Sequence, residues 1–311
     1  MSCKVTKWIA ACICALVTHA SFAQVPEEEM DPGIFTLDSF VLADVALGFD
    51  VGDFIRLVQE DSSFYRSFQN LRRIEYAGSA TVRMFTEDHL VQALYSNRTV
   101  QHLDGGCRSM EFPFEVSTGD FFDKQGDFNY LTAGVFAYIF LYRDTICGNI
   151  VETDNNAGAD KQLELRKEQL KTLIFNPGAP VDGVPLIGDK MEIFSADMQP
   201  FYDYSIRTER YATGVDCYVF TVDKKPEAEK GKDVVINHLS TWFDKKTMEI
   251  VARQYALSYF TPVFDFDVFM DVRLDVINGY RVPVSITYNG FWDIPLRKPE
   301  IGSVQLKVFE R

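Results

Sequence analysis

Residues that commonly carry acid–base or metal chemistry are sparse in this chain. Beyond the first 23 residues it has three histidines, His89, His102 and His238, and none lies four residues from another histidine or a glutamate, as zinc-hydrolase helices require. The serine, phosphate-loop and dinucleotide motifs G-x-S-x-G, G-x-x-x-x-G-K-[ST] and G-x-G-x-x-G are also missing. These absences count against the commonest hydrolases and nucleotide enzymes rather than against all enzymes. We expect no catalytic residue, no metal site and no cofactor, and thus a protein that is not an enzyme; the least favoured alternative is a secreted enzyme with a site of another kind.

Two polar arrangements remain as weaker candidates for chemistry. His102 and Asp104 lie on the same side of an extended segment, but a solvated strand end explains such a pair more simply. Four aspartates share one side of a second segment, where residues two apart are separated by about 6.5 to 7 Å along a strand. They are Asp265, Asp267, Asp271 and Asp275. A solvated sheet face explains them better than a cation site.

Three cysteines follow the first 23 residues, namely Cys107, Cys147 and Cys217. In an oxidising compartment this odd number allows one disulfide and leaves one thiol. Cys107 and Cys147 each stand beside glycine in loop-like sequence, whereas Cys217 opens a strand-like run. We therefore predict a disulfide between Cys107 and Cys147 and a buried thiol at Cys217.

The first 23 residues have the layout of a cleaved export signal. Lys4 and Lys7 precede an apolar stretch from Trp8 to Val17, and a small-x-small site ends at Ala23. We expect cleavage there and a periplasmic or secreted protein, with lipidation at Cys12 as the alternative. No later run reaches the 18 apolar residues that a membrane-spanning helix needs, so no transmembrane segment is expected in the mature chain.

The composition is that of a folded protein with a large core. Hydrophobic residues make up 47% of the chain and charged residues 24%, and the formal net charge is −14. A chain this acidic repels phosphate backbones and anionic membrane surfaces, and no local basic patch is evident in the sequence. We therefore expect no nucleic acid among its partners.

The periodicity of apolar residues predicts a chain that is mainly antiparallel β with a few helices, an α+β protein. Apolar residues follow helical spacing from Asp53 to Ile74, and alternation with a period of two begins at Tyr76. Most of the remainder reads as strands and hairpins. The apolar segment from Ala133 to Tyr142 is compatible with either a buried helix or a buried strand, and a helix is expected from Asp160 to Ile174.

The clearest alternation lies between Phe264 and Val276, where even positions are apolar and most odd positions are charged. We expect the even-numbered residues to face one common interior. Keeping the apolar residues of the next strand on that side requires a three-residue loop, Ile277-Asn278-Gly279, rather than a two-residue turn. This register places Val276 opposite Tyr280 and Met270 opposite Ile286.

Taken together, these features resemble the outer-membrane lipoprotein carrier and lipoprotein-sorting superfamily of bacterial envelopes (LolA/LolB-like). The resemblance rests on an exported chain, the helix that runs into Tyr76–Val82, the hairpin around Thr241–Ile250 and the passage Gly279–Pro283 before the closing strands. It implies an incompletely closed β-barrel whose concave side is covered by helices and receives lipid acyl chains. Residues 24–311 then form one carrier-like domain, with an insertion around 121–188.

On this basis we expect a non-catalytic periplasmic binding protein for a lipid, a lipoprotein acyl chain or another apolar ligand, with an envelope protein as a further partner class. The apolar sheet face supplies the expected ligand lining: Val82, Met84, Tyr204, Phe266, Val268, Met270 and Val272. Taken residue by residue, a filled core explains the same residues better than a cavity lining does. The alternative is therefore a structural or interaction protein of the envelope with a filled barrel and no ligand.

Overall fold

A single antiparallel sheet carries most of the chain. The computed structural model describes residues 35–37, 50–147, 188–212, 214–261, 264–294 and 297–311, all within one compact unit, Pro32–Arg311. The strands are β1 (Phe35–Leu37), β2 (Tyr76–Phe85), β3 (Val91–Asp104), β4 (Cys107–Thr118), β5 (Ile146–Cys147), β6 (Tyr202–Arg210), β7 (Asp216–Lys224), β8 (Ile236–Asp244), β9 (Ile250–Thr261), β10 (Phe264–Ile277), β11 (Tyr280–Asp293) and β12 (Glu300–Glu310). The expected antiparallel α+β class is confirmed.

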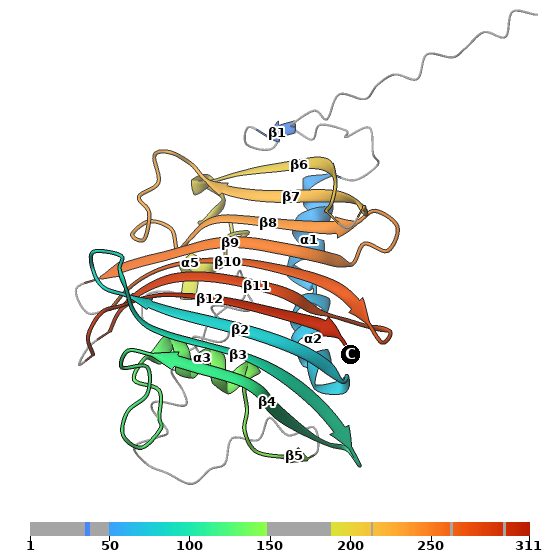
Figure 1. Ribbon diagram of the computed structural model, residues 1–311. Coiled ribbons are helices and arrows are strands. Elements are labelled where there is room, and N and C mark those ends of the chain that lie inside the picture. The colour runs from blue at the N-terminus through green and yellow to red at the C-terminus, as the bar shows by residue number, and fades with distance from the viewer. Residues whose placement is uncertain (1–34, 38–49, 148–187, 213, 262–263, 295–296) are drawn as a thin grey trace, which may run out of the picture. The chain divides into compact units, whose positions relative to one another are not determined.

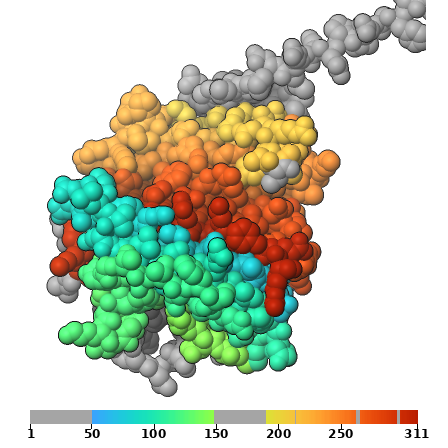
Figure 2. All heavy atoms as spheres, in the orientation of Figure 1, coloured from blue at the N-terminus to red at the C-terminus, as the bar shows by residue number. Residues whose placement is uncertain are grey.

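The sheet is open rather than closed into a barrel. Its strand order is β1-β6-β7-β8-β9-β10-β11-β12-β2-β3-β4-β5, so the C-terminal strand β12 pairs with β2, the first long strand of the chain. Figure 2 shows β12 in red between β11 and the cyan β2, seen from the side of the sheet away from the helices. Every step between neighbours except β1 to β6 and β12 to β2 is a connection to the next strand in sequence, as expected for a chain of hairpins.

Two short helices cross one face of this sheet. They are α1 (Val51–Glu60) and α2 (Ser63–Asn70), followed by the 3-10 turn η1 (Leu71–Arg73), and they run across the strands behind the sheet in Figure 1. The sequence predicted one continuous helix from Asp53 to Ile74, which is wrong at Asp61. The Asp61 carboxylate accepts hydrogen bonds from the backbone of Ser63 and Phe64, so it caps a new helix instead of continuing the first one.

Contacts of buried aromatic rings attach the helices to the sheet. The Phe54 ring on α1 lies 5.6 to 5.9 Å from the rings of Tyr218, Phe220 and Phe243. Further along, the Asn70 side chain at the end of α2 donates to the Arg281 carbonyl of β11. The pair of helices therefore spans the sheet from β7 to β11. Phe54, Val58 and Phe64 are buried on the side that faces the sheet, whereas Tyr65, which follows the same apolar spacing, is 37% exposed.

The segment whose structure the sequence left open is a helix, α3 (Leu131–Phe140). All ten of its residues are uncharged. Its start is capped from β12, because the buried Glu300 carboxylate accepts from the backbone of Leu131 and Thr132, and an anion at a helix N-terminus is stabilising. The remaining described helices are α5 (Gly188–Met191) and η2 (Gln199–Phe201). The predicted helix from Asp160 to Ile174 lies outside the described residues.

The hairpin between β10 and β11 corrects our predicted register. Ile277 pairs with Tyr280 and Val276 with Arg281, so Asn278 and Gly279 form a two-residue turn with positive φ at both positions, the geometry that Asn-Gly favours. Val276 is consequently 53% exposed. A register shift between Arg273 and Leu274 then places Val272 opposite Ile286 and Met270 opposite Tyr288. A β-bulge, not a longer loop, returns the apolar residues to one face.

Candidate functional site

The seven residues of the predicted ligand lining, Val82, Met84, Tyr204, Phe266, Val268, Met270 and Val272, all lie in one hydrophobic core cluster. Their exposed fractions are between 0 and 9%. None of them lines any of the pockets described below. The alternation therefore identified one buried face correctly, whereas a cavity along it stays a prediction.

The structure contains the disulfide between Cys107 and Cys147. The two residues are register partners of β4 and β5, so the bond attaches the segment after α3 to the sheet. Cys217 is a buried free thiol. Burial, together with nearby carboxylates, raises the pKa of this thiol to about 11, so the group is an unreactive core side chain.

The weaker polar candidates do not form a site. His102 contacts Glu111 and Arg311 on an open strand face rather than Asp104. The aspartates of β10 have separate partners: Asp267 pairs with Lys230, and Asp271 with Arg273. Across the described ranges, no group of His, Cys, Asp and Glu side chains is arranged to hold a metal ion.

A small pocket of about 60 Å³ lies where α2 and α3 meet one end of strands β2 to β4. We call it the α2–α3 pocket. Its lining comes from α2 and η1 (Tyr65, Phe68, Gln69, Leu71, Arg72), from the strands (Tyr76, Gln101, Arg108) and from α3 and the segment after it (Tyr138, Ile139, Phe140, Tyr142, Ile146). It thus joins a mainly aromatic wall to a small polar end.

Gln101 organises the polar end of the α2–α3 pocket. Its Nε2 donates to the carbonyls of Leu71 and Ile74, each at 2.6 Å, and its Oε1 accepts from the Tyr142 hydroxyl at 2.7 Å. One buried amide on β3 therefore holds both the turn that carries Arg72 and the tyrosine beside Arg108. Because each amide group is used, the geometry is well determined.

Two arginines, Arg72 and Arg108, line this polar end. The Tyr142 ring lies 5.1 Å from the guanidinium carbon of Arg108, within the range of a cation–π contact. Burial lowers the pKa of Arg108, and the positive charge of Arg72 lowers it further. Burial, only partly opposed by the two arginines, raises the pKa of Tyr142 to about 12. The pocket therefore has a local positive potential in an acidic protein.

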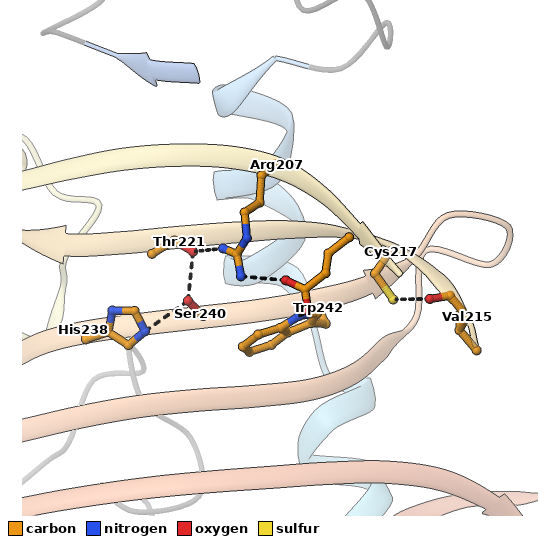
Figure 3. Close-up of polar contacts among 8 residues, drawn as sticks. Arg207, Val215, Cys217, Thr221, His238, Ser240 and Trp242 are labelled. Atoms are coloured by element: carbon orange, nitrogen blue, oxygen red, sulfur yellow. Dashed lines mark hydrogen bonds and ion pairs between the residues drawn. The ribbon is translucent and has the colours of Figure 1, made fainter. Parts of the chain in front are cut away.

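A second polar feature lies on strands β6 to β8, on the face away from α1 and α2. Asp223 contacts His238 Nδ1 at 2.6 Å, and His238 Nε2 contacts the Ser240 hydroxyl at 3.0 Å. The order of these three groups is that of a hydrolase triad. Hydrogen bonds continue from Ser240 to Thr221 and from there to Arg207 (Figure 3).

The burial of Ser240 argues against a catalytic role for this polar chain. Ser240 is 3% exposed, and its hydroxyl is shared between His238 and Thr221. None of the pockets described for the resolved ranges is lined by it. We therefore conclude that this series of hydrogen bonds is structural and satisfies the polar groups on this face of the sheet.

One cation is buried beneath the helices. Arg253 on β9 is 2% exposed, its Nε donates to the Thr241 hydroxyl at 3.2 Å and its guanidinium lies 4.5 Å from the Phe64 ring. Its Nη2 is buried, and no residue in the part of the chain that the structure describes forms a hydrogen bond with it. Burial lowers the pKa of Arg253, and the Asp61 charge opposes this.

Sequence reasoning missed the polar end of the α2–α3 pocket. Arg72 and Arg108 are far apart in the chain and meet only because β2, β3 and β4 are consecutive hairpins. The usable signal was modest: a basic residue at the end of an amphipathic helix, and another directly after a cysteine predicted to form a disulfide. The same topology explains why no basic patch was evident in the sequence.

No protein-family model matches the chain, and no curated protein matches it. Solved structures that align with it include a DUF1329 family protein from Desulfovibrio piger, with 13% identity over 82% of this chain and 88% of that one and a TM-score of 0.23. A LolA superfamily protein from Nitrosomonas europaea aligns with 11% identity over 81% and 94% of the two chains, with a TM-score of 0.21.

An outer membrane lipoprotein-sorting protein domain from Vibrio parahaemolyticus also aligns, with 10% identity over 82% of this chain and 90% of that one and a TM-score of 0.25. The structural neighbours thus include the superfamily that the sequence resembles. Likeness at these identities and TM-scores carries no argument about what the chain binds, so the function has to be argued from its own residues.

Proposed function

We propose that this chain is a non-catalytic binding protein for a lipid or another ligand with an apolar chain, and that the ligand enters through the α2–α3 pocket. The observation that carries the proposal is the aromatic wall of this pocket, to which two separate helices contribute. In this wall the ring centroids of Phe68 of α2 and Phe140 of α3 lie 6.4 Å apart, so the two rings contact each other. Ligand pockets are typically concave and mostly apolar, with a few polar groups that orient the ligand.

Exposed aromatic residues at the rim support this proposal. Tyr65 is 37% and Tyr138 47% exposed, and both line the pocket. Large apolar side chains gathered at the mouth of a pocket mark contact surfaces more often than isolated ones do. By contrast, a wider groove at the other end of the same strands is lined by charged residues such as Glu87, Asp88 and Lys298, which suits an apolar chain poorly.

In this proposal, the seven lining residues predicted from the sequence contact the far end of the ligand, beyond the α2–α3 pocket. The core is packed, so an acyl chain reaches Met270 or Phe266 only if α1 and α2 move away from the sheet. In this view the helices act as a cover over a concave binding face. The insertion around 121–188 contributes α3, one wall of the entrance.

The cellular setting is part of the same proposal. The export signal at residues 1–23 lies outside the described residues, so a periplasmic or secreted location, a single domain from 24 to 311, a lipoprotein acyl chain as ligand and an envelope protein as partner rest on the sequence. None of the helices in the described ranges is long and apolar enough to span a bilayer.

The alternative is a structural or interaction protein with a filled barrel, and the packed core favours it. Native mass spectrometry of protein purified from its own envelope separates the two functions. Two variants sharpen the test, because each places a carboxylate at an exposed apolar position: Tyr138→Asp in the pocket rim and Val276→Asp in the β10–β11 hairpin.

We expect a bound lipid mass on the wild-type protein and on Val276→Asp, and its loss from Tyr138→Asp, because a charge at the rim opposes entry of an apolar chain. Wild-type protein that carries no apolar molecule would overturn the proposal in favour of the filled barrel. Equal lipid loading of both variants would place the ligand elsewhere.

A further inference from the structure

The polar end of the α2–α3 pocket carries positive charge that none of the described lining residues neutralises. None of the described residues that line this pocket is acidic. Arg72 and Arg108 form no ion pair with any residue in the described ranges, although the chain as a whole has a formal net charge of −14. Surface arginines of such an acidic protein readily find carboxylates, so two unpaired ones at a single pocket call for an explanation.

The position of Arg108 adds a second, independent observation. Its Nε atom is buried and has no hydrogen-bond partner among the described residues, which is costly for a charged donor. The neighbouring charge of Arg72 adds repulsion, and both effects lower the pKa of Arg108. An anion placed between the two guanidinium groups removes the repulsion and supplies the missing acceptor.

Resting on the proposed function, we propose that the α2–α3 pocket binds an amphiphile with an anionic head, a carboxylate or a phosphate, which lies between Arg72 and Arg108. Its apolar chain then extends along Phe68, Leu71 and Phe140. Guanidinium groups bind both oxyanions through paired N–H donors.

The size of the pocket agrees with this assignment of the head group. Its volume of about 60 Å³ corresponds to about four water molecules. This is enough for a carboxylate or phosphate but not for a long chain. The disulfide and Gln101 hold the surrounding segments in place, so the head group meets a preformed site while the chain continues along the aromatic wall.

The test is isothermal titration of the purified full-length chain with three ligands that share one chain: decanoate, decyl phosphate and decanol. Acetate and inorganic phosphate serve as heads without a chain. Each ligand is titrated into the wild type, Arg72→Gln, Arg108→Gln and the control Arg98→Gln, which removes the same charge from an exposed position on β3 outside the pocket.

We expect decanoate or decyl phosphate to bind at least about tenfold more tightly than decanol, because charge-assisted hydrogen bonds form only with the anions. Each pocket variant should reduce this preference about tenfold and leave decanol binding unchanged, which also verifies that the pocket is folded. Arg98→Gln should behave as the wild type. The stronger of the two anionic ligands identifies the head as carboxylate or phosphate.

Two results would overturn the anionic head while leaving the proposed function intact: decanol binding as tightly as the anions, or a preference unchanged in both pocket variants. Inorganic phosphate or acetate binding as tightly as its chain-bearing counterpart would indicate a site for a small anion instead of an amphiphile. Failure of all three decyl ligands to bind would overturn both proposals together.

Discussion

At the scale of single residues, the interior of this sheet and its outer face use polar groups differently. On the outer face, Asp223, His238, Ser240 and Thr221 satisfy one another in a continuous chain. Inside, Arg253 donates one hydrogen bond to Thr241 and lies against the Phe64 ring, as far as the described ranges show. The first arrangement stabilises the sheet, whereas the second places an incompletely paired charge in a dry environment.

For the hydrogen-bonded series on the outer face we predict a contribution to stability and no chemical reactivity. Ser240→Ala removes one buried hydroxyl that connects His238 and Thr221, and should lower the free energy of unfolding by about 1 kcal/mol in urea denaturation. A fluorophosphonate probe should leave the wild-type protein unlabelled, because the hydroxyl is buried. Covalent labelling that disappears in Ser240→Ala and in His238→Ala would contradict this and identify a working nucleophile.

For a substitution of Arg253 we predict the opposite effect, an increase in the free energy of unfolding. Arg253→Met keeps most of the side-chain volume and removes the buried charge, so the free energy of unfolding should rise by about 1 to 2 kcal/mol. Arg98→Met, an exposed change of the same chemistry, should alter it by less than about 0.5 kcal/mol. If Arg253→Met is clearly less stable than the wild type, the contact of the guanidinium with Phe64 and Thr241 outweighs the cost of burial.

At the scale of elements, the alternation of apolar residues was the most reliable guide. It located the start of β2 and the long β10–β11 hairpin, and it assigned the even-numbered residues from Phe266 to Leu274 to the buried face. It failed where two local preferences compete, as in this hairpin. There the Asn278-Gly279 turn adopts its preferred two-residue geometry, and the β-bulge restores the buried register several residues later.

The helices show the same limit of sequence reasoning. The apolar spacing of α1 and α2 is nearly continuous, so periodicity alone predicts one helix. The break depends on the Asp61 carboxylate accepting two backbone N–H groups, a local choice that a helical wheel does not represent. The α2–α3 pocket was out of reach for a further reason, since Arg72, Gln101 and Arg108 become neighbours only through strand pairing.

Two glycines allow a matched test of the hairpin turn and of α3. A Cβ atom added at Gly279 or at Gly134 meets no atom within 4 Å, but only Gly279 has positive φ (80°). Gly279→Ala should therefore lower the free energy of unfolding by about 1 kcal/mol. Gly134→Ala, in a helix, should raise it by about 0.5 to 1 kcal/mol.

Urea denaturation of the two alanine variants and the wild type measures both changes in the free energy of unfolding under the same conditions. Because neither change creates or removes a side-chain contact, packing does not obscure the backbone effect. A stabilising Gly279→Ala would show that the turn relaxes to another geometry and would reopen the question of the hairpin register.

At the scale of the whole molecule, the acidic surface and the packed core set the conditions for binding. Long-range repulsion disfavours anions, so an anionic ligand gains its affinity only at short range, at Arg72 and Arg108. The core offers no ready space for a long chain, since Phe54 and Phe64 of the two helices are almost completely buried against the sheet. Binding beyond the pocket therefore requires the helices to move.

This requirement leads to a prediction about chain length. In the series octanoate, decanoate and dodecanoate, each added methylene should strengthen binding by less than the full transfer value of about 0.8 kcal/mol. The reason is that separating α1 and α2 from the sheet costs free energy and offsets part of this contribution. Hydrogen exchange measured by mass spectrometry should show faster exchange of the α1 and α2 amides with dodecanoate than with octanoate, while β7 to β11 stay protected.

An affinity that stops increasing after octanoate, with unchanged exchange in both helices, would confine the ligand to the α2–α3 pocket. The seven buried residues on the sheet face would then be a core and not a lining, since a chain that never displaces the helices never reaches Met270 or Phe266.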